Sequence, residues 1–259
     1  MNQPDRHLGD GPETTEDFFL GDRVTIRQPV KGYRAGIDAV LLAACARSGE
    51  GPILDVGCGV GTVGLCAAAR CGDPRAVLVE REPELAQLAQ ANVDRNCLGD
   101  RVSVVEADIG EPLSSAAAHI LSADSFAHVL ANPPFHNEGA GTPSHWPLKA
   151  VSHAMTADAL EIWVRFMARM TMPGGRATMI HKADALPRIL RVFENRFGAL
   201  TVLPIHPREG EPAIRVLIDG IKGSRAALSI KPGLILHGEG NAFRPDVDAI
   251  LRQGATLKL

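Results

Sequence analysis

The sequence predicts an α/β fold in which a mainly parallel sheet carries helices on both faces. Between Pro52 and Ile180, short apolar runs alternate with longer segments whose apolar residues recur at helical spacing. Glycine and proline mark the ends of these segments. Such alternation is typical of a doubly wound sheet. The chain has 259 residues, 45% of them hydrophobic and 22% charged, which is enough for one large domain with a sizeable core.

The beginning of the chain differs in composition from the rest. Residues 1–17 are polar and acidic, and we expect them to be disordered. A single domain is expected over residues 18–259, with a short strand–helix extension at residues 18–50. Within this extension, residues 23–26 have the composition of a strand, and Asp38 is expected to cap the helix that follows.

The alternating part predicts a series of short buried strands at residues 53–56, 76–80, 101–105, 126–131 and 177–180. The glycine-rich stretch after the first strand leads into a helix that ends near Gly72, and Glu82-Pro83 opens the next helix. A further helix begins at Thr156, and Pro173-Gly174-Gly175 ends it. After Leu200 the pattern changes to strands joined by turns, at residues 201–205, 214–218, 228–230 and 234–236.

Composition also indicates the compartment in which the protein is expected. Five cysteines without a C-x-x-C pair indicate small core residues in a reducing compartment, so we expect a cytoplasmic protein. No apolar run is long enough to span a membrane, and the N-terminal residues lack the pattern of a secretory signal. The histidines lack metal-ligand spacing, and we therefore expect no metal.

A glycine-rich loop, "DVGCGVGTVG" from Asp55 to Gly64, follows the first strong strand and opens a helix. Gly59-x-Gly61-x-x-Gly64 also satisfies the dinucleotide-binding pattern G-x-G-x-x-G. However, the glycines begin at Gly57, directly after an acid at the strand end. A carboxylate there would repel a pyrophosphate, whereas it can hold the amino-acid end of S-adenosylmethionine. The loop therefore favours S-adenosylmethionine over a nicotinamide dinucleotide.

Acids also end the next two predicted strands. Glu80 is placed to accept hydrogen bonds from both ribose hydroxyls, a feature that fits either cofactor. Asp108, in "VVEAD", could accept a hydrogen bond from the adenine amine of the cofactor. A lone acid at a strand end is often only a cap or a loop charge. Three successive strands that each end in an acid favour a binding site.

The stretch "VLANPPF", from Val129 to Phe135, ends the fourth strand of the alternating part. Its two prolines cannot donate ladder hydrogen bonds, so the strand must stop at Asn132. The Asn132 side-chain oxygen and the Pro133 carbonyl would be two acceptors for one amine with two hydrogens. Holding both hydrogens directs the nitrogen lone pair at a methyl group, and Phe135 would stack on a flat substrate.

These stretches resemble a known family. "DVGCGVG", "VEREP", "EAD" and "NPPF" are similar to the motifs of class I S-adenosylmethionine-dependent methyltransferases that act on amino groups. The flanks "QPVKGYRAGIDAVLLAACA", "AIRVLI" and "LILHGEGNAFRPDVDAILRQ" resemble bacterial valine-tRNA adenine-N(6) methyltransferases, which modify an adenine in the anticodon loop. The resemblance spans residues 18–253. It implies a Rossmann-like fold with a seven-stranded mixed sheet whose last strand runs antiparallel.

The resemblance also implies a set of site residues. The cofactor S-adenosylmethionine would be bound by the glycine loop and the strand ends, at Asp55, Gly57, Cys58, Gly59, Gly61, Glu80, Arg81, Asp108, Ile109 and Asn132. The catalytic residues would be Asn132, Pro133, Pro134 and Phe135. The family often has Tyr at the last of these positions, and both rings can stack. The tRNA substrate would meet Lys31, Tyr33, Arg34, Phe135 and His136.

The expected RNA contact has some support from charge. Residues 22–34 are basic around Tyr33, and residues 220–238 hold Lys222, Arg225 and Lys231 with no acid. Local basic patches can grip phosphates although the whole chain has a formal charge of −3. For each patch taken alone, an ordinary solvated surface is an equally good interpretation.

Several alternatives remain open at this point. The N-P-P-F chemistry also serves enzymes that methylate a glutamine of release factors or a guanine of ribosomal RNA. An NAD-dependent oxidoreductase would fit the glycine pattern, but no hydride-transfer residues accompany it. A non-catalytic RNA-binding module would retain the fold, and an intact Asn132 argues against it.

Overall fold

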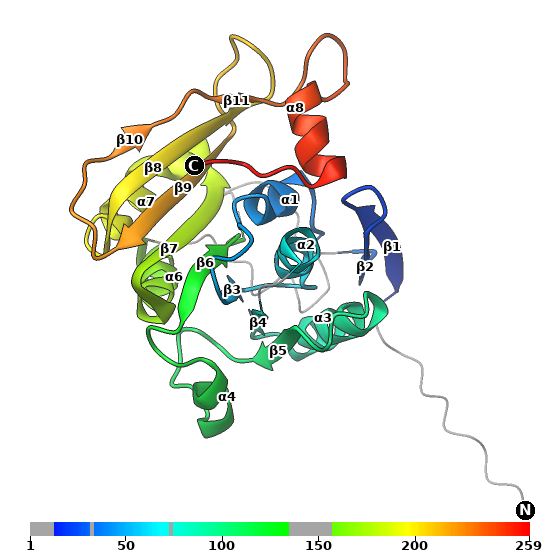
Figure 1. Ribbon diagram of the computed structural model, residues 1–259, viewed down its shortest axis with the longest axis vertical. Coiled ribbons are helices and arrows are strands. Elements are labelled where there is room, and N and C mark those ends of the chain that lie inside the picture. Colours follow the sequence, from blue (N-terminus) through cyan, green and yellow to red (C-terminus); the bar gives the residue numbers. More distant parts are fainter. Residues whose placement is uncertain (1–12, 32–33, 73–74, 135–156) are drawn as a thin grey trace, which may run out of the picture.

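The computed structural model describes residues 13–31, 34–72, 75–134 and 157–259. Within that part of the chain the main sheet has nine strands, in the order β10-β8-β9-β7-β6-β3-β4-β5, with β11 paired to β8 (Figure 1). The strands are β3 (Ile53–Val56), β4 (Ala76–Glu80), β5 (Val102–Glu106), β6 (Phe126–Ala131), β7 (Thr171–Lys182), β8 (Phe197–His206), β9 (Arg215–Lys222), β10 (Ser229–Ile230) and β11 (Leu234–Ile235).

The predicted seven-stranded mixed sheet is confirmed in its principal strands. β5, β4, β3, β6 and β7 run parallel to one another, and β9 runs antiparallel between β7 and β8. Two short strands, β10 and β11, extend the sheet along β8. β7 begins earlier than predicted, at Thr171, because Pro173-Gly174-Gly175 lies in an irregular part of the strand where the pairing with β6 shifts register.

Helices cover both faces of this sheet. They are α1 (Ile37–Ala43), α2 (Thr62–Cys71), α3 (Pro83–Arg95), α4 (Ser115–Ile120), α6 (Ala157–Met170), α7 (Leu186–Phe193) and α8 (Pro245–Asp248), with short turns at Ala183–Ala185 and Ala249–Gln253. α1, α2 and α3 lie on one side of the sheet in Figure 1, and α6 and α7 on the other. Alternate strand residues enter two separate apolar clusters: Ile53 packs toward α1 and α2, and Leu54 toward α6. Burial on both faces explains why these strands are continuously apolar.

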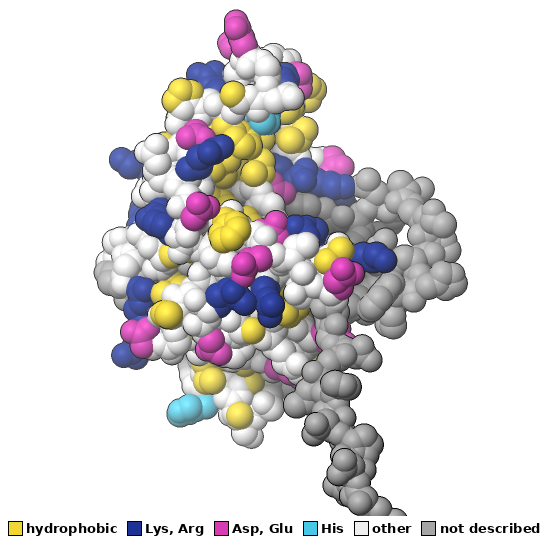
Figure 2. Space-filling view, turned by 90° about the vertical axis from the view of Figure 1, so that its right-hand side faces the viewer, with side chains coloured by type: hydrophobic (Ala, Val, Ile, Leu, Met, Phe, Trp, Pro, Cys, Tyr) yellow, Lys and Arg dark blue, Asp and Glu magenta, His cyan; other side chains and the backbone are white. Residues whose placement is uncertain are grey.

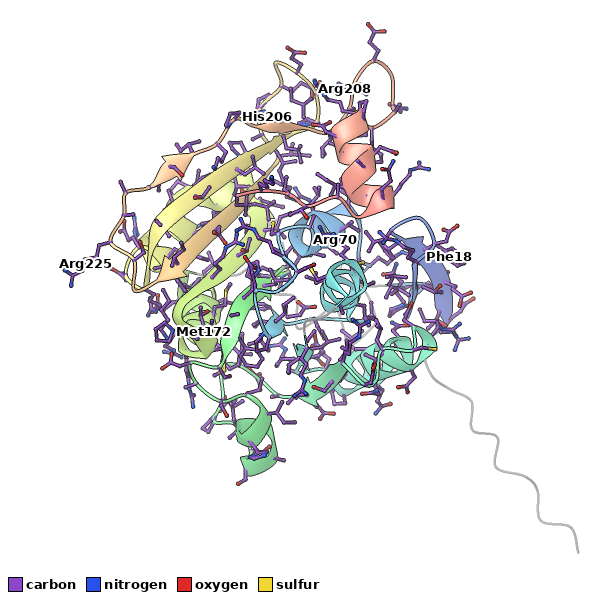
Figure 3. The ribbon with its side chains drawn as sticks, in the orientation of Figure 1. Phe18, Arg70, Met172, His206, Arg208 and Arg225 are labelled. Carbon is purple, nitrogen blue, oxygen red and sulfur yellow. The ribbon has the colours of Figure 1, made fainter. Side chains whose placement is uncertain are left out.

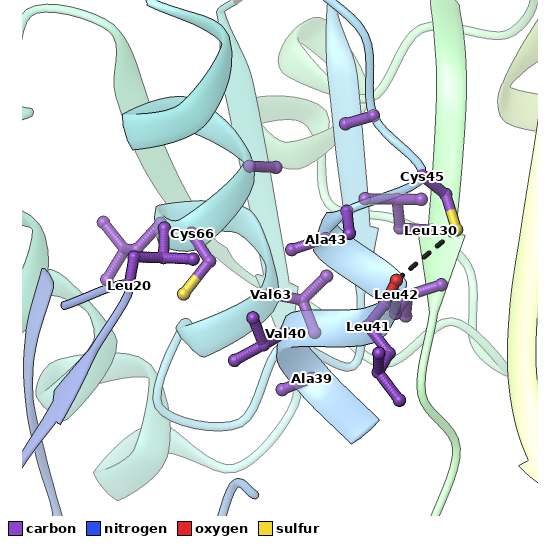
Figure 4. Packing of buried hydrophobic residues seen from close by; sticks show 14 of the residues in the cluster. Leu20, Ala39, Val40, Leu41, Leu42, Ala43, Cys45, Val63, Cys66 and Leu130 are labelled. Carbon is purple, nitrogen blue, oxygen red and sulfur yellow. Dashed lines mark hydrogen bonds between the residues drawn. The ribbon is translucent and has the colours of Figure 1, made fainter. Parts of the chain in front are cut away.

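The first of these clusters is built from α1, α2 and the strand β6. Figure 4 shows Val40, Leu41 and Val63 packed together there, with Leu130 of β6 close by. Its cysteines behave as small core residues: Cys45, Cys58, Cys66 and Cys71 are buried and free, whereas Cys97 is exposed. Burial raises the pKa of the Cys45 and Cys66 thiols to about 12, so these thiols stay protonated and unreactive.

An N-terminal hairpin precedes the sheet. β1 (Thr14–Phe19) pairs antiparallel with β2 (Val24–Pro29). The expectation that disorder extends to residue 17 is therefore wrong for Thr14–Asp17, because a cross-strand partner gives this polar segment its ladder hydrogen bonds. Residues 1–12 lie outside the described part.

Two asparagines of α3 hold the hairpin against the domain. Asn92 is fully buried; its amide accepts from the Arg27 backbone N–H at 2.8 Å and donates to the carbonyls of Arg27 and Val60, each at 2.9 Å. One turn later, Asn96 makes the same reciprocal pair with the backbone of Thr25. These side chains take the place of a neighbouring strand for β2, so the hairpin is fixed to α3, the helix that follows β4.

Arg70 joins three distant parts of the chain. From α2, its guanidinium donates to the carbonyls of Ala43, the last residue of α1, and of Ala46, and to those of Gly254 and Ala255 near the C-terminus. Figure 3 shows Arg70 beside α1 and the C-terminal segment. The arginine thus satisfies helix-end carbonyls that have no partner within α1.

The start of α1 differs from the prediction. Gly36, not Asp38, is the N-cap residue, and no side chain caps the helix there. Asp38 instead lies in the first turn and pairs with Arg215 of β9, with 2.8 Å between Oδ2 and Nε. The long-range ion pair therefore replaces the local cap. No helix in the described ranges is long and apolar enough to cross a membrane.

Asn92→Ala should lower the free energy of unfolding by about 1–3 kcal/mol, because it leaves a buried N–H and two carbonyls without partners. Urea unfolding monitored by circular dichroism measures this change. Asn195→Ala is the matched control, since the Asn195 amide is exposed and only donates to a carbonyl of its own helix turn. Equal stabilities of the two variants would contradict the role of Asn92.

Candidate active site

Strand register brings the predicted site residues to one edge of the sheet. Val56 pairs with Val79 of β4 and with Ala131 of β6. The next residue of each strand segment is a predicted site residue, so Gly57, Glu80 and Asn132 lie level on three adjacent chains. This edge is formed by the carboxyl ends of parallel strands, where open α/β sheets bind ligands.

The glycine loop turns sharply over this edge. Gly57 has φ 63° and Gly61 has φ 89°, a region that residues with a side chain rarely enter. Gly61 is the N-cap residue of α2 and donates its N–H to the carbonyl of Cys58. The Cys58 thiol is buried, and burial raises its pKa well above the ordinary value. Cys58 therefore contributes backbone to the loop and no reactive thiolate.

Glu80 is held by three backbone N–H groups. Its Oε2 accepts from Gly59 at 2.8 Å, and its Oε1 accepts from Arg81 at 2.9 Å and from Glu82 at 3.0 Å. A carboxylate offers about four acceptor positions, so roughly one position remains for a ligand. The carboxylate is 7% exposed and fixed in direction before any ligand arrives. Hydrogen bonding of Glu80 to ribose hydroxyls stays a prediction. Oε2 accepts only one of the three N–H groups, so the remaining acceptor position lies on that oxygen.

Asp55 lies beneath the loop. It is 1% exposed, and its Oδ2 accepts the N–H of Gly64 in the first turn of α2 at 2.9 Å. Burial raises the pKa of Asp55 to about 7; the Gly64 bond lowers it, and the neighbouring Glu80 charge raises it further. The carboxyl therefore anchors α2 to β3. Contact with the amino-acid end of a cofactor remains a prediction.

A third acid lies at the far end of this edge, after β5. Asp108 follows β5, and its Oδ1 accepts the N–H of Gly110 at 2.8 Å. Its Oδ2 lies 3.9 Å from the Arg81 guanidinium, and both side chains are partly exposed. Ile109 is half-buried against the apolar cluster on the α6 face. The positions of Arg81, Asp108 and Ile109 beyond β4 and β5 fit the adenine end of the cofactor.

Asn132 carries an unused acceptor. Its Oδ1 is buried and has no hydrogen-bond partner among the described residues. Because buried polar atoms are nearly always paired, such an oxygen indicates a missing donor. Pro133 is buried and Pro134 exposed. Phe135 and His136 lie outside the described residues. The orphaned amide oxygen and the glycine cradle fit the presence of S-adenosylmethionine and an amine at this edge.

The expected RNA-facing residues divide into two groups. Arg34 is paired on the protein surface: its guanidinium donates to both carboxylate oxygens of Asp17, at 2.9 and 2.8 Å, and to Thr15 Oγ1 at 2.7 Å. By contrast, Arg27 and Lys31 have no ion-pair partner within 4.0 Å in the described part, and Lys31 is exposed. Tyr33 lies outside the described residues.

The face that carries the hairpin is mixed in charge. Figure 2 shows Lys and Arg side chains interspersed with Asp and Glu there, and Arg95 pairs with Glu16 at 2.6 Å. Phe18 is 59% exposed on the hairpin and points away from the protein in Figure 3. A continuous basic stripe is therefore absent from the described residues of this face, and contact of Lys31 with RNA remains a prediction.

One residue near the site was missed by sequence reasoning. Trp163 of α6 lies against Gly57, at a point where a Cβ on this glycine would overlap the indole ring. Its helical spacing with Leu160 and Met167 predicts only a core position. No sequence signal distinguishes it from its buried neighbours.

Comparison with known proteins supports the interpretation of this edge. Residues 36–162 match the family model described as the methyltransferase small domain. A tRNA1(Val) (adenine(37)-N6)-methyltransferase of Porphyromonas gingivalis is 30% identical over 73% of this chain and 76% of its own length. The enzyme of that name from Musicola paradisiaca is 30% identical over 92% of this chain and 94% of its own length.

A ribosomal RNA enzyme and two solved structures were also compared with the chain. The ribosomal RNA large subunit methyltransferase G of Klebsiella pneumoniae is 31% identical over 52% of this chain, but over 35% of its own. A solved structure from Agrobacterium tumefaciens, described as a predicted O-methyltransferase, has a TM-score of 0.70 at 31% identity and covers 86% of this chain and 99% of its own. The tRNA (m1A58) methyltransferase of Aquifex aeolicus, at TM-score 0.52 and 16% identity, covers 76% and 72% and shows the fold alone.

Glu80→Ala should weaken binding of S-adenosylhomocysteine by about 1.5–3 kcal/mol, the range for a hydrogen bond to a charged group. Isothermal titration calorimetry measures the affinity, and Glu106→Ala on the adjacent strand is the matched control because Glu106 is exposed. Micromolar binding of NAD by the wild type, without binding of S-adenosylhomocysteine, would contradict the cofactor assignment.

Asp55→Asn should change how stability depends on pH. The folded carboxyl titrates near 7 and the ordinary value is 3.8, so the folded state holds an extra proton between these values. This stabilising contribution is complete below the lower value and is lost as the pH rises through the higher one. Urea unfolding of wild type and variant should therefore diverge between about pH 4 and about pH 7, with wild type losing on the order of 4 kcal/mol relative to Asp55→Asn. Parallel curves would show that Asp55 does not carry this proton.

Proposed function

The chain belongs to the tRNA1(Val) (adenine(37)-N6)-methyltransferase family, and from that premise we propose that it methylates the exocyclic amine of an adenine in the anticodon loop of tRNA. S-adenosylmethionine is the methyl donor of this class of enzyme. The observation that carries the proposal for this chain is the buried Oδ1 of Asn132 at the strand end beside the glycine loop, which has no hydrogen-bond partner among the residues that the structure describes.

The residues that would hold the cofactor lie at the carboxyl ends of the adjacent strands β3, β4 and β5. Glu80 offers its remaining acceptor position to the ribose, Asp108 its Oδ2 to the adenine amine, and the loop from Gly57 to Gly61 its backbone to the methionine part. When bound, S-adenosylmethionine supplies an electrophilic methyl group on a positively charged sulfur. The prior fixation of Glu80 by three N–H groups supports binding, because little side-chain freedom is lost.

Asn132 and Pro133 would orient the target amine. The adenine nitrogen is a weak nucleophile because its lone pair is delocalised into the ring. The Asn132 side-chain oxygen and the Pro133 carbonyl accept its two hydrogens, which tilts the nitrogen toward tetrahedral geometry and directs the lone pair outward. These acceptors also stabilise the positive charge that develops on nitrogen. Phe135 would stack on the base, and Pro134 restricts the backbone between ring and acceptors.

The choice of RNA rests on the relatives. Two relatives named for tRNA1(Val) cover most of this chain and of their own lengths, whereas the ribosomal RNA enzyme matches over 35% of its own. The unpaired Lys31 and Arg27 support contact with phosphates, and we place the activity in the cytoplasm, where tRNA is. Membership of the family removes the oxidoreductase alternative. Methylation of a release-factor glutamine would use the same acceptors, but no relative given above carries that name.

The function is tested with purified protein, S-adenosylmethionine and unmodified tRNA1(Val) transcript, followed by mass spectrometry of the nucleosides. N(6)-methyladenosine should form, and a transcript with guanine at position 37 should give none. Methylation of ribosomal RNA or of a release factor in place of the transcript would overturn the assignment.

Asn132→Ala should abolish turnover, at a cost on the order of 3–4 kcal/mol in transition-state stabilisation, while leaving binding of S-adenosylhomocysteine nearly intact. Asn132→Asp keeps an acceptor of similar size and adds a negative charge, so it should retain more activity than the alanine variant. Single-turnover methylation of the transcript measures both, with calorimetry as the binding control. If Asn132→Ala methylated the transcript at the wild-type rate, the "NPPF" stretch would have no catalytic role and would serve only as a turn.

Lys31→Ala should weaken tRNA binding and reduce the slope of log affinity against log salt by about one. Arg95→Ala provides the comparison, because Arg95 is already neutralised by Glu16 and should leave the slope nearly unchanged. Filter binding over a range of salt concentrations measures both slopes. Identical slopes for wild type and Lys31→Ala would assign Lys31 to an ordinary solvated surface.

A further inference from the structure

Helix α6 reaches two loops at the carboxyl edge of the sheet. Trp163 lies against Gly57 after β3: a Cβ built on that glycine would be 3.0 Å from Cζ3 of the indole and closer still to Cη2. Ile162 lies near Gly110 after β5, where a Cβ would be 3.8 Å from its Cγ2. β3 and β5 flank β4, which ends in Glu80. Two consecutive residues of α6 therefore line both ends of the loop system that holds Glu80 and Asp108.

The exposure of Trp163 differs from that of its neighbours on the helix. Leu160, Val164 and Met167 are at most 1% exposed in the apolar cluster between α6 and the sheet. Trp163 packs against the same cluster but is only partly buried. A large indole that leaves part of its surface uncovered beside a glycine cradle provides a flat apolar wall.

The contact also gives a second reason for glycine at position 57. The positive φ alone disfavours a side chain there, and the indole removes the space that a side chain would need. Apolar walls with a few fixed polar groups are the usual composition of small-molecule sites, and here the polar groups are Glu80 and Asp108.

We propose that Trp163 is a cofactor-binding residue whose indole forms the α6-side wall of the S-adenosylmethionine cleft beside Gly57. This proposal rests on the proposed function for the presence of the cofactor. It adds a contact from an element outside the glycine loop and the acidic strand ends. Burial of the uncovered part of the indole by the ligand would stabilise the complex.

The chain has two tryptophans, so the fluorescence of Trp163 can be measured alone once the other tryptophan is replaced. In a Trp146→Phe background, Trp163 is the sole tryptophan. Titration with S-adenosylhomocysteine should change its emission in a saturable manner, with the same midpoint as isothermal titration calorimetry. Unchanged emission, with binding still seen by calorimetry, would overturn the proposal.

Substitution provides the second measurement. Trp163→Leu should weaken S-adenosylhomocysteine about tenfold, and Trp163→Phe should weaken it less because a smaller ring preserves part of the wall. Phe166→Leu is the matched control: Phe166 is a buried aromatic of the same helix that should affect stability without changing affinity. Wild-type affinity in both Trp163 variants would overturn the proposal. Failure of the wild type to bind S-adenosylhomocysteine would instead overturn the proposed function.

Discussion

The hydrogen bond from the Gly59 N–H to the Glu80 carboxylate, 2.8 Å long, is the interaction on which the site depends. It ties the loop after β3 to the end of β4, so the loop cannot move without moving the acid. The same carboxylate accepts from Arg81 and Glu82 and thereby fixes the turn into α3. α3 in turn holds the N-terminal hairpin through Asn92, whose amide also donates to Val60 of the loop. Loop, helix and hairpin are therefore one connected unit.

This arrangement places two carboxyl groups close together at the end of a buried sheet. Asp55 and Glu80 are 1% and 7% exposed, and the charge of Glu80 helps to raise the pKa of Asp55. The N–H groups of Gly64 and Gly59 offset part of the cost of burial. The N–H groups of Gly59 and Gly64 therefore hold both carboxyl groups in fixed directions at this edge.

The hairpin supplies an ion-pair partner to Arg34, one of the basic residues that precede α1. Arg34 is neutralised by Asp17, and Gln28 accepts the Ala35 N–H at 2.8 Å while donating to the same aspartate at 2.9 Å. These contacts fix the chain as it leaves the hairpin toward α1. Arg34 is therefore already paired within the chain, whereas Lys31 and Arg27 have no ion-pair partner among the described residues.

The sequence by itself determined the strands at 53–56, 76–80 and 126–131, the glycine loop, the acids at strand ends and the N-P-P turn. Each is encoded within a short window, through apolar runs, glycine conformations and the constraints of proline. Only the tertiary structure decided the partners: Asp17 with Arg34, Asp38 with Arg215, and Gly57 with Trp163. Thr14–Asp17 is a strand because β2 lies beside it, and Trp163 borders the site because α6 packs across the strand ends. Such pairings join residues far apart in the chain, so they cannot be predicted from the composition of a short sequence window.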